Sequence, residues 1–386
     1  MELYFMEPKK LVEEQFLQLY GEKPQKFFMS PGRVNLIGEH TDYNGGYVFP
    51  CALDFGTYGA AARRDDHLIR LASGNITQGC DVSLDDIHYK AEHGWANYPK
   101  GVVFEFLKLG HKIGGFSLFM WGNIPNASGL SSSASIEMLT AMAINELYDC
   151  GLSTKEMVLL CQRVENQFMG VNCGIMDQYA VAFGKKDHAI LLNCQAPSHE
   201  YVPLDLGDYL IMIANTKAKR GLADTKYNER RAECETAAKI LGTKDLCGLD
   251  IPSFEAKKHL ITDPIILKRA SHAVYENART VEAVKVLNAG DLQTFGKMMN
   301  ESHISLRDLY EVTGDELDAL VEAAWKVDGV LGSRMTGAGF GGCTVSILHK
   351  SAVDNFKETV GKEYSAKTGL TADFYVANVG DGTREI

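Results

Sequence analysis

The chain lacks an excess of basic residues. Its 386 residues include 39 Lys and Arg against 50 Asp and Glu, which gives a formal net charge of −11. Proteins that bind nucleic acids through phosphate contacts normally present a basic surface. The composition therefore argues against a nucleic acid as a main partner.

The sequence also lacks the marks of a membrane or secreted protein. No apolar run reaches the roughly 18 residues that a spanning helix needs, and the first residues, with Glu2 and Glu7, lack the apolar core of a secretory signal. The nine cysteines include no CxxC pair, so neither a zinc site nor a disulfide framework is predicted. We expect a cytoplasmic protein with no membrane partner.

What is present is an ordinary globular composition, with 45% hydrophobic and 23% charged residues. Helical and strand patterns alternate in both halves, which predicts an α+β or α/β fold. The polar segment Ala196–Asp208 is the predicted boundary between an N-terminal domain (1–200) and a C-terminal domain (201–386). Helices are expected at 8–20, 132–148, 153–168, most of 220–330 and 353–364, and strands at 27–29, 47–53, 68–72, 116–121, 189–194, 209–214, 343–348 and 372–377.

A first glycine-rich loop is predicted at Pro31–Pro50, after a short aromatic strand. Its polar side chains include carboxylates, an imidazole, amides and a hydroxyl within a dozen residues. A sugar hydroxyl both donates and accepts hydrogen bonds, so this mixture suits a polyol. The simpler interpretation is a solvated loop rich in turn residues. The polar positions are Arg33, Asn35, Glu39, His40, Thr41, Asp42 and Asn44.

A second loop, Gly122–Ser135, lies between a predicted strand and a predicted helix. That order brings backbone N–H groups and the positive helix end to an anion. The loop has no GxxxxGK[ST] motif and is not a P-loop. A Ser-rich helix cap needs only one serine, whereas four stand among residues 131–135. The loop therefore predicts phosphate binding, with a serine available to Mg²⁺.

A third loop, Met335–Cys343, formally matches GxGxxG. A strand and not a helix follows it, so it does not predict a dinucleotide site. Its glycines permit close approach of the backbone to a ligand or to another loop.

Two carboxylates, Glu165 and Asp177, flank a Cys-Gly turn. They could meet across that turn, one as a metal ligand and one as a base. The simpler interpretations are a solvated carboxylate at a helix end for Glu165 and a helix N-cap for Asp177.

Together these segments resemble the sugar-kinase branch of the galactose, homoserine, mevalonate and phosphomevalonate (GHMP) kinase superfamily, the galactokinase family. PGRVNLIGEHTDYNGG resembles its sugar signature, GLSSSAS its ATP loop, CGIMDQ its catalytic-aspartate segment and GSRMTGAGFGGC its third motif. The resemblance implies an N-terminal domain like the second domain of ribosomal protein S5, a ferredoxin-like C-terminal domain, and an active site between them.

The resemblance also implies a role for each matching residue. Asp177 would be the base and Arg33 its catalytic partner. Mg²⁺ would be held by Ser133 and Glu165. The sugar would be bound by Glu39, His40, Thr41, Asp42, Gly174 and Tyr227. ATP would be bound by Ser73, Ala127, Ser128, Gly129, Leu130, Ser131, Ser132 and Ser133, with Ala127 standing where many members have glycine.

The implied activity is ATP- and Mg²⁺-dependent phosphorylation of the C1 hydroxyl of α-D-galactose, the first committed step of galactose catabolism in the Leloir pathway. We expect a monomer acting on small molecules. The sequence leaves open whether Asp177 accepts the proton or mainly orients the hydroxyl. It also leaves open a kinase for N-acetylgalactosamine or arabinose, and a catalytically silent galactose sensor.

Overall fold

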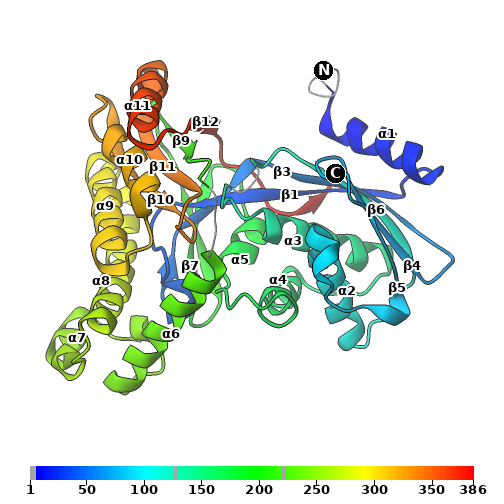
Figure 1. The fold of residues 1–386 in the computed structure, drawn as a ribbon, viewed down its shortest axis with the longest axis horizontal. Helices are drawn as coiled ribbons and strands as arrows, with labels where there is room; N and C mark the ends of the chain where they lie inside the picture. Colours follow the sequence, from blue (N-terminus) through cyan, green and yellow to red (C-terminus); the bar gives the residue numbers. More distant parts are fainter. Residues whose placement is uncertain (1–5, 126–127, 219–222) are drawn as a thin grey trace.

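The structure, a computed structural model, describes residues 6–125, 128–218 and 223–386. Three sheets organise two lobes, which stand side by side in Figure 1. We define the first lobe as residues 6–203 with the returning segment 378–386, and the second lobe as residues 209–377.

A six-stranded sheet forms the centre of the first lobe. Its strand order is β13 (Arg384–Glu385), β1 (Lys26–Asn35), β3 (Pro50–Arg63), β6 (Phe116–Gly122), β4 (Leu68–Ser73) and β5 (Cys80–Ser83). Only the β4–β6 pair is parallel among the described pairs of this sheet. A small sheet of β2 (Tyr47–Val48), β7 (His188–Asn193) and β8 (Ser198–Pro203) lies toward the second lobe.

Helices cover both faces of the large sheet (Figure 1). Helix α1 (Pro8–Tyr20) packs Leu11, Val12 and Phe16 on one face. A larger apolar core lies on the other face. It is built with α2 (Asn97–Lys108), α3 (Ser132–Leu147), α4 (Thr154–Arg163) and α5 (Met176–Phe183).

The second lobe is ferredoxin-like. Its antiparallel sheet has the order β10 (Val330–Thr336), β11 (Cys343–His349), β9 (Tyr209–Asn215) and β12 (Asp373–Ala377). In chain order this is strand, helical crossover, hairpin, helix and strand, the split βαβ arrangement. Its helices are α6 (Ala223–Leu241), α7 (Ile251–Lys257), α8 (Pro264–Asn288), α9 (Leu292–Ser305), α10 (Gly314–Ala324) and α11 (Val353–Thr368).

Strand β9 shows how this sheet is buried on both faces. Met212 and Ala214 pack among residues of α10 and α11, whereas Ile211 and Ile213 belong to a cluster with α8 and α9. That second cluster also contains Val34 and other first-lobe residues. Each buried aliphatic side chain contributes roughly 1.5–3 kcal/mol, so a shared apolar core fixes the lobes against each other.

The structure confirms most predicted elements, adds helix α2 and strand β5, which the sequence did not predict, and corrects three further points. The segment 31–35 is not loop, because β1 continues to Asn35 with a register shift between Pro31 and Arg33. The segment 196–208 contains strand β8, which pairs with β7. The residues before the third loop form an unpredicted strand, β10. The domain boundary near residue 200 stays a prediction, and the structure adds that β13 returns to pair with β1. None of the described helices combines the length and apolar character needed to cross a bilayer.

Candidate functional site

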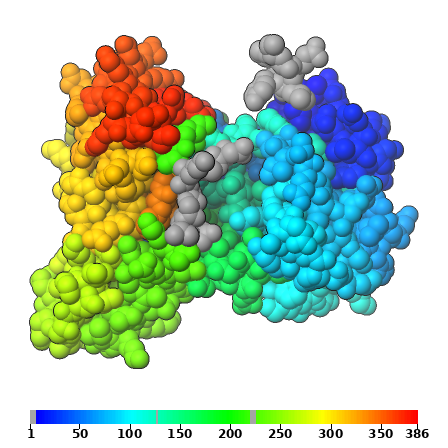
Figure 2. Space-filling view, viewed as in Figure 1, coloured from blue at the N-terminus to red at the C-terminus, as the bar shows by residue number. Residues whose placement is uncertain are grey.

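A cavity of about 510 Å³ lies between the lobes, within the range of small-molecule sites. Figure 2 shows the surface hollowed between the cyan part of the first lobe and the yellow-orange second lobe. The first loop, the second loop, the Glu165–Gln178 segment, helix α6 and the third loop all contribute lining residues. The tertiary fold thus brings together all four segments that the sequence singled out.

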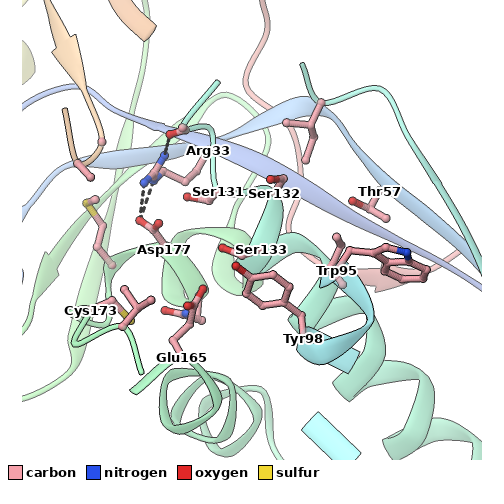
Figure 3. A pocket seen from close by; sticks show the side chains of 18 of the residues that line it. Arg33, Thr57, Trp95, Tyr98, Ser131, Ser132, Ser133, Glu165, Cys173 and Asp177 are labelled. Atoms are coloured by element: carbon pink, nitrogen blue, oxygen red, sulfur yellow. Dashed lines mark hydrogen bonds and ion pairs between the residues drawn. The ribbon is translucent and has the colours of Figure 1, made fainter. Parts of the chain in front are cut away.

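Arg33 connects Asp177, the predicted base, to the second loop. Its Nε and Nη2 donate to Oδ1 of Asp177 at 2.9 and 2.6 Å, and its Nη1 donates to the Gly129 carbonyl at 2.7 Å (Figure 3). The guanidinium is only 3% exposed, whereas the Asp177 side chain is 33% exposed. Two charge-assisted N–H donors on one oxygen fix its orientation as well as balance its charge. Asp177 is therefore held in place while remaining open to the cavity.

The simpler interpretations of the two carboxylates are wrong. Helix α5 begins at Met176 with Ile175 at its N-cap, so Asp177 lies in the first turn and is not the cap. Glu165 is 7% exposed and is not a solvated helix end. It lies on a π-helical turn, Val164–Met169, and lines the cavity. Such π-turns are frequent at functional sites.

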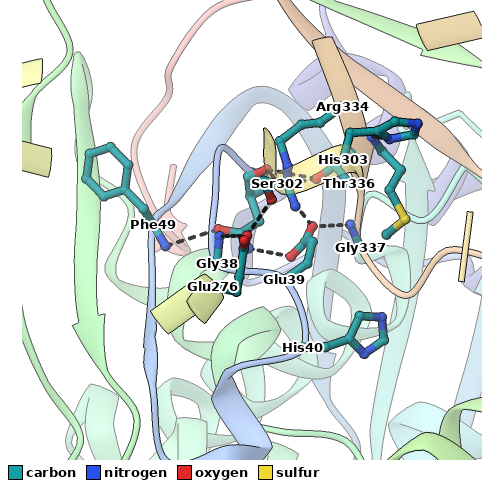
Figure 4. Close-up of polar contacts among 12 residues, drawn as sticks. Gly38, Glu39, His40, Phe49, Glu276, Ser302, His303, Arg334, Thr336 and Gly337 are labelled. Carbon is teal, nitrogen blue, oxygen red and sulfur yellow. Dashed lines mark hydrogen bonds and ion pairs between the residues drawn. The ribbon is translucent and has the colours of Figure 1, made fainter. Parts of the chain in front are cut away.

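Glu39 is a fully buried carboxylate of the first loop. Its Oε2 accepts from the Asn35 side-chain amide and its Oε1 accepts from the N–H of Gly337 (Figure 4). Burial raises the pKa of this carboxyl, and the positive charges of Arg334 and Arg33 oppose that rise. Both oxygens therefore have N–H donors, and the residue still lines the cavity.

The tautomer of His40 follows from its partners. Its Nε2 lies 3.2 Å from the Ala338 carbonyl, which can only accept, so Nε2 carries the proton. Its Nδ1 then accepts from the Tyr43 hydroxyl at 2.7 Å, which in turn accepts from the Tyr310 hydroxyl at 2.7 Å. The Cys234 thiol continues the chain, 3.1 Å from Tyr310. Burial lowers the pKa of His40 to about 3, so the ring is a neutral, fixed wall of the cavity.

Asp42 is packed against the turn that precedes Asp177. The Met176 N–H lies 3.5 Å from its Oδ2, and a Cβ added at Gly174 would lie only 1.8 Å from the same oxygen. Burial and the charge of Asp177 raise the pKa of Asp42 to about 6. Gly174 therefore makes room for Asp42, and both line the cavity together with Tyr227.

Thr41 is the predicted sugar residue that the structure places elsewhere. It is fully buried, and its hydroxyl lies 2.9 Å from the Gly38 carbonyl and 2.7 Å from that of Tyr47. It is not among the lining residues. Its hydroxyl is used within the loop, and a sugar contact by Thr41 stays a prediction that these contacts do not favour.

The second loop presents serines at the start of α3. Ser131 has a left-handed backbone (φ 60°), and its buried Oγ has no hydrogen-bond partner within the described residues. Ser131, Ser132, Ser133 and Gly129 line the cavity at the N-terminal end of the helix. An unsatisfied buried hydroxyl at a helix N-terminus fits an anionic ligand.

Three predicted ATP positions, unlike these serines, are not seen to line the cavity. Ser128 and Leu130 are 2% and 1% exposed and do not line the cavity. Leu130 instead packs in the shared core, and its carbonyl accepts from the backbone N–H of Arg33 at 3.1 Å. Their side chains are therefore buried beneath the loop and do not face the cavity. Ala127 lies outside the described residues.

Ser133 and Glu165 both line the cavity, as a shared Mg²⁺ would require. Within residues 6–125, 128–218 and 223–386, no cluster of three or more His, Cys, Asp or Glu could hold a metal ion. Mg²⁺ keeps several waters and is commonly bound through one or two protein oxygens plus phosphate oxygens. The donor set therefore fits a magnesium–triphosphate complex, and Mg²⁺ binding stays a prediction.

Of the residues in one wall of the cavity, the sequence predicted only Ser73. This wall also contains Trp95, Tyr98, Asn75 and Ile76. The Trp95 indole N–H donates to the Gln78 carbonyl at 3.0 Å, which fixes the ring. Trp95 and Tyr98 lie near each other in Figure 3. The only sequence signal was three aromatic residues, Tyr89, Trp95 and Tyr98, in the polar segment 88–98. Such a wall suits a flat heterocycle.

The third loop approaches the first and second loops closely, as its glycines predict. Gly337 and Gly339 have positive φ values of 85° and 78°. A Cβ at Gly339 would lie 2.2 Å from the Val312 carbonyl, and one at Gly337 would lie 3.0 Å from the Gly129 carbonyl. Only glycine fits both positions.

Comparisons with known proteins show which family this chain resembles. A galactokinase galactose-binding signature matches residues 14–63, and the N- and C-terminal domains of GHMP kinases match residues 97–185 and 283–366. The galactokinases of Clostridium tetani and Fusobacterium nucleatum are 52% and 56% identical to this chain. They cover 97% and 95% of it, over 97% and 96% of their own lengths.

Solved structures of related kinases share the fold of this chain. Galactokinase from Lactococcus lactis, complexed with galactose, is 45% identical with a TM-score of 0.95, over 98% of this chain and 99% of its own. The mevalonate kinase of Methanococcus jannaschii shares the fold at 20% identity and a TM-score of 0.66, over 92% of this chain and 98% of its own.

Proposed function

Because this chain belongs to the galactokinase family, a family of sugar kinases, we propose that the cavity between its lobes carries α-D-galactose and ATP side by side. The γ-phosphoryl group passes to the C1 hydroxyl, giving galactose 1-phosphate and ADP. One observation supports this assignment most strongly. Arg33 contacts both the Asp177 carboxylate and the Gly129 carbonyl, so the base and the phosphate loop share one rigid connection.

The sugar end of the cavity is assigned to the first loop. Asp42, beside Gly174, and Glu39 supply carboxylate acceptors, and Tyr227 closes the pocket with its ring 5.5 Å from that of His40. Because both His40 nitrogens already have protein partners, His40 shapes the pocket and is not assigned a hydrogen bond to the sugar.

Asp177 takes the proton of the C1 hydroxyl as its oxygen bonds to the γ-phosphorus. The bond from that phosphorus to the bridging oxygen of ADP breaks in the same displacement, so ADP leaves with the electron pair. Arg33 uses only Oδ1 of Asp177, so Oδ2 is the oxygen assigned to the proton. A positioned base contributes roughly 10²–10⁴-fold. Positioning and charge stabilisation supply most of the remainder in phosphoryl transfer.

The nucleotide end is assigned to the serine loop and the aromatic wall. The N–H groups at the start of α3 and the Ser131 hydroxyl face the triphosphate, and Trp95 and Tyr98 flank the base. Ser133 and Glu165 would hold Mg²⁺, which neutralises phosphate charge when bound. No disulfide joins any two of the nine cysteines, which supports the proposed cytoplasmic setting.

A sugar panel tests the proposal. ADP release is measured with galactose, N-acetylgalactosamine and arabinose, and the product is identified by phosphorus NMR. We expect galactose 1-phosphate as the preferred product. If only another sugar is turned over, that sugar is the substrate in place of galactose. If galactose binds without turnover, the protein is a sensor. The intact Ser131–Ser135 segment and the Arg33–Asp177 pair favour the enzyme over the sensor.

A further inference from the structure

The end of strand β10 and the turn after it, residues 334–338, touch the first loop at consecutive positions. The Gly337 N–H donates to Glu39, and the Ala338 carbonyl accepts from His40. On the strand itself, Arg334 Nη1 donates to the Asn35 carbonyl at 3.0 Å. This short segment of the third motif therefore contacts the sugar-facing residues of the first motif (Figure 4).

Arg334 is as deeply buried as its partners Glu39 and Asn35. It is 0% exposed, and its Nε and Nη2 have no hydrogen-bond partner within the part of the chain that the structure describes. The carboxylate within 4 Å of it is Glu39, at 3.7 Å from Nη1 to Oε1. A buried charge is costly unless it is balanced. Arg334 and Glu39 therefore depend on each other electrostatically.

Arg334 also acts on Glu276: burial raises the pKa of that carboxyl, but the charges of Arg279, His272 and Arg334 lower it below its usual value. Glu276 also lies in this buried cluster, but its Oε1 accepts from the Gly38 N–H at 3.0 Å and from Ser302, and its Oε2 is paired with Arg279. Glu39 is the member that lines the cavity. An effect of Arg334 on the ligand would therefore pass through Glu39.

Both oxygens of Glu39 must act as hydrogen-bond acceptors. Since both of its oxygens accept from N–H groups, an amide in its place would set an NH₂ against a donor. Only a carboxylate satisfies both contacts and still offers lone pairs to a ligand. The nearby guanidinium provides the balancing charge.

We propose that Arg334 is a positioning residue for sugar recognition: through its buried contact with Glu39 it orients and charge-balances the carboxylate that accepts a sugar hydroxyl. The third motif then serves the sugar end of the site as well as approaching the phosphate loop. This inference rests on the proposed function, because it assumes that the first loop binds the sugar.

The test compares kcat/KM for galactose and for its 2-, 3-, 4- and 6-deoxy analogues in the wild type, Glu39→Gln, Arg334→Met and Arg334→Lys. The hydroxyl read by Glu39 is the one whose removal costs the wild type much more than it costs Glu39→Gln. We expect Arg334→Met to lose discrimination at that same hydroxyl by roughly 10- to 100-fold, the value of a hydrogen bond to a charged group. The KM for ATP should change little.

Arg334→Lys serves as the conservative variant. It keeps the charge but loses the planar fork, so it should restore part of the discrimination. Glu105→Gln is the matched control: Glu105 is also buried, pairs with Lys108 and Arg163, and does not line the cavity. This control should lower the melting temperature and leave the discrimination pattern as in the wild type.

A uniform loss across all analogues in Arg334→Met, or a rise confined to the KM for ATP, would overturn the inference. If Arg334→Met does not fold, the same pattern is read from Arg334→Lys, and wild-type discrimination there would also overturn it. Absence of any galactose turnover in the wild type would instead overturn the proposed function. Galactose titration by calorimetry without ATP then still tests whether Arg334 supports sugar binding.

Discussion

Arg33 places two N–H donors on a single oxygen of Asp177. Nε and Nη2 lie 2.9 and 2.6 Å from Oδ1, and Nη1 turns to the Gly129 carbonyl at 2.7 Å. The guanidinium thus orients the carboxylate through Oδ1 alone and makes no hydrogen bond to Oδ2. A division of this kind allows one side chain to be held by an arginine and still receive a proton.

Asp177→Asn should lower kcat by about 10²–10⁴-fold with little change in the galactose KM. The side chain keeps its shape and one carbonyl oxygen for Arg33, but it loses the basic oxygen. Steady-state kinetics with a galactose titration checks this, and circular dichroism checks the fold. A variant that keeps most of its kcat would show that Asp177 is not the base.

Arg33→Lys should reduce kcat roughly 100-fold, a typical effect of removing one preorganised donor. Lysine keeps the positive charge but cannot bridge Asp177 and Gly129 at once. Single-turnover phosphoryl transfer measures the effect, and thermal unfolding should stay near the wild type. Near-normal turnover would show that charge alone suffices and that the bridge is dispensable.

Asp42→Asn should make the folded protein more stable, and the gain should depend on pH. Burial and Asp177 raise the pKa of Asp42 to about 6 in the folded protein, against about 3.9 in an unfolded chain. The folded state therefore binds the extra proton between about pH 4 and 6, and stability from this group falls as pH rises through that window. The gain in melting temperature should grow from pH 4 to 6 and then level off. A pH-independent gain would contradict the raised pKa.

The same group predicts a pH effect on sugar binding. Below about pH 6 Asp42 is protonated in the free enzyme and loses its acceptor charge. We expect the wild-type kcat/KM for galactose to fall there, and Asp42→Asn to lack that limb of the profile.

Gly174→Ala should weaken galactose use strongly. A Cβ would lie 1.8 Å from the Asp42 Oδ2, so the carboxylate or the turn must shift. Gly248→Ala is the matched control, because its Cβ would meet only the Gln195 side chain at 3.7 Å. The ratio of galactose KM values in the two variants is the measurement. Similar values in both would show that the Asp42 position is not critical.

Glu165→Ala and Ser133→Ala should raise the half-saturating Mg²⁺ concentration by at least about 10-fold, the lower end of what even outer-shell changes cost at metal sites. Galactose binding should change little. Glu146→Ala, which removes a 41% exposed carboxylate of α3, serves as the control. Unchanged Mg²⁺ titrations in both variants would remove these residues from the metal site.

The sequence predicted the regular elements well where patterning is strong. Ser153 and Glu156 form the expected capping box, and α1 spans the predicted residues 8–20. It failed where short-range signals conflict. Strand β10 lies beside a glycine-rich turn, and β8 lies in a polar segment that reads as a linker; both are strands because β11 and β7 pair with them.

The residues of the candidate site also fall into those that the sequence indicated and those that it did not. Dense polar residues on glycine-rich loops, and the family resemblance, identified Asp177, Arg33 and Glu165 from sequence. Thr41 was assigned to the sugar because a hydroxyl in a binding loop looks alike whether it faces the ligand or the backbone. The wall of Trp95 and Tyr98 was missed because scattered aromatic residues in a polar segment carry no periodic signal.

The sequence by itself determined the chemistry available to this protein: the carboxylates, the serine loop, the glycines that permit close approach, and hence its family. Only the tertiary structure decided which groups face one another. Arg33 and Asp177 are 144 positions apart, and Arg334 and Glu39 are 295 apart, yet each pair is in contact. The first contact depends on how α5 packs in the core of the first lobe, and the second on the apolar core shared by the lobes. Neither packing arrangement can be derived from the local sequence around these residues.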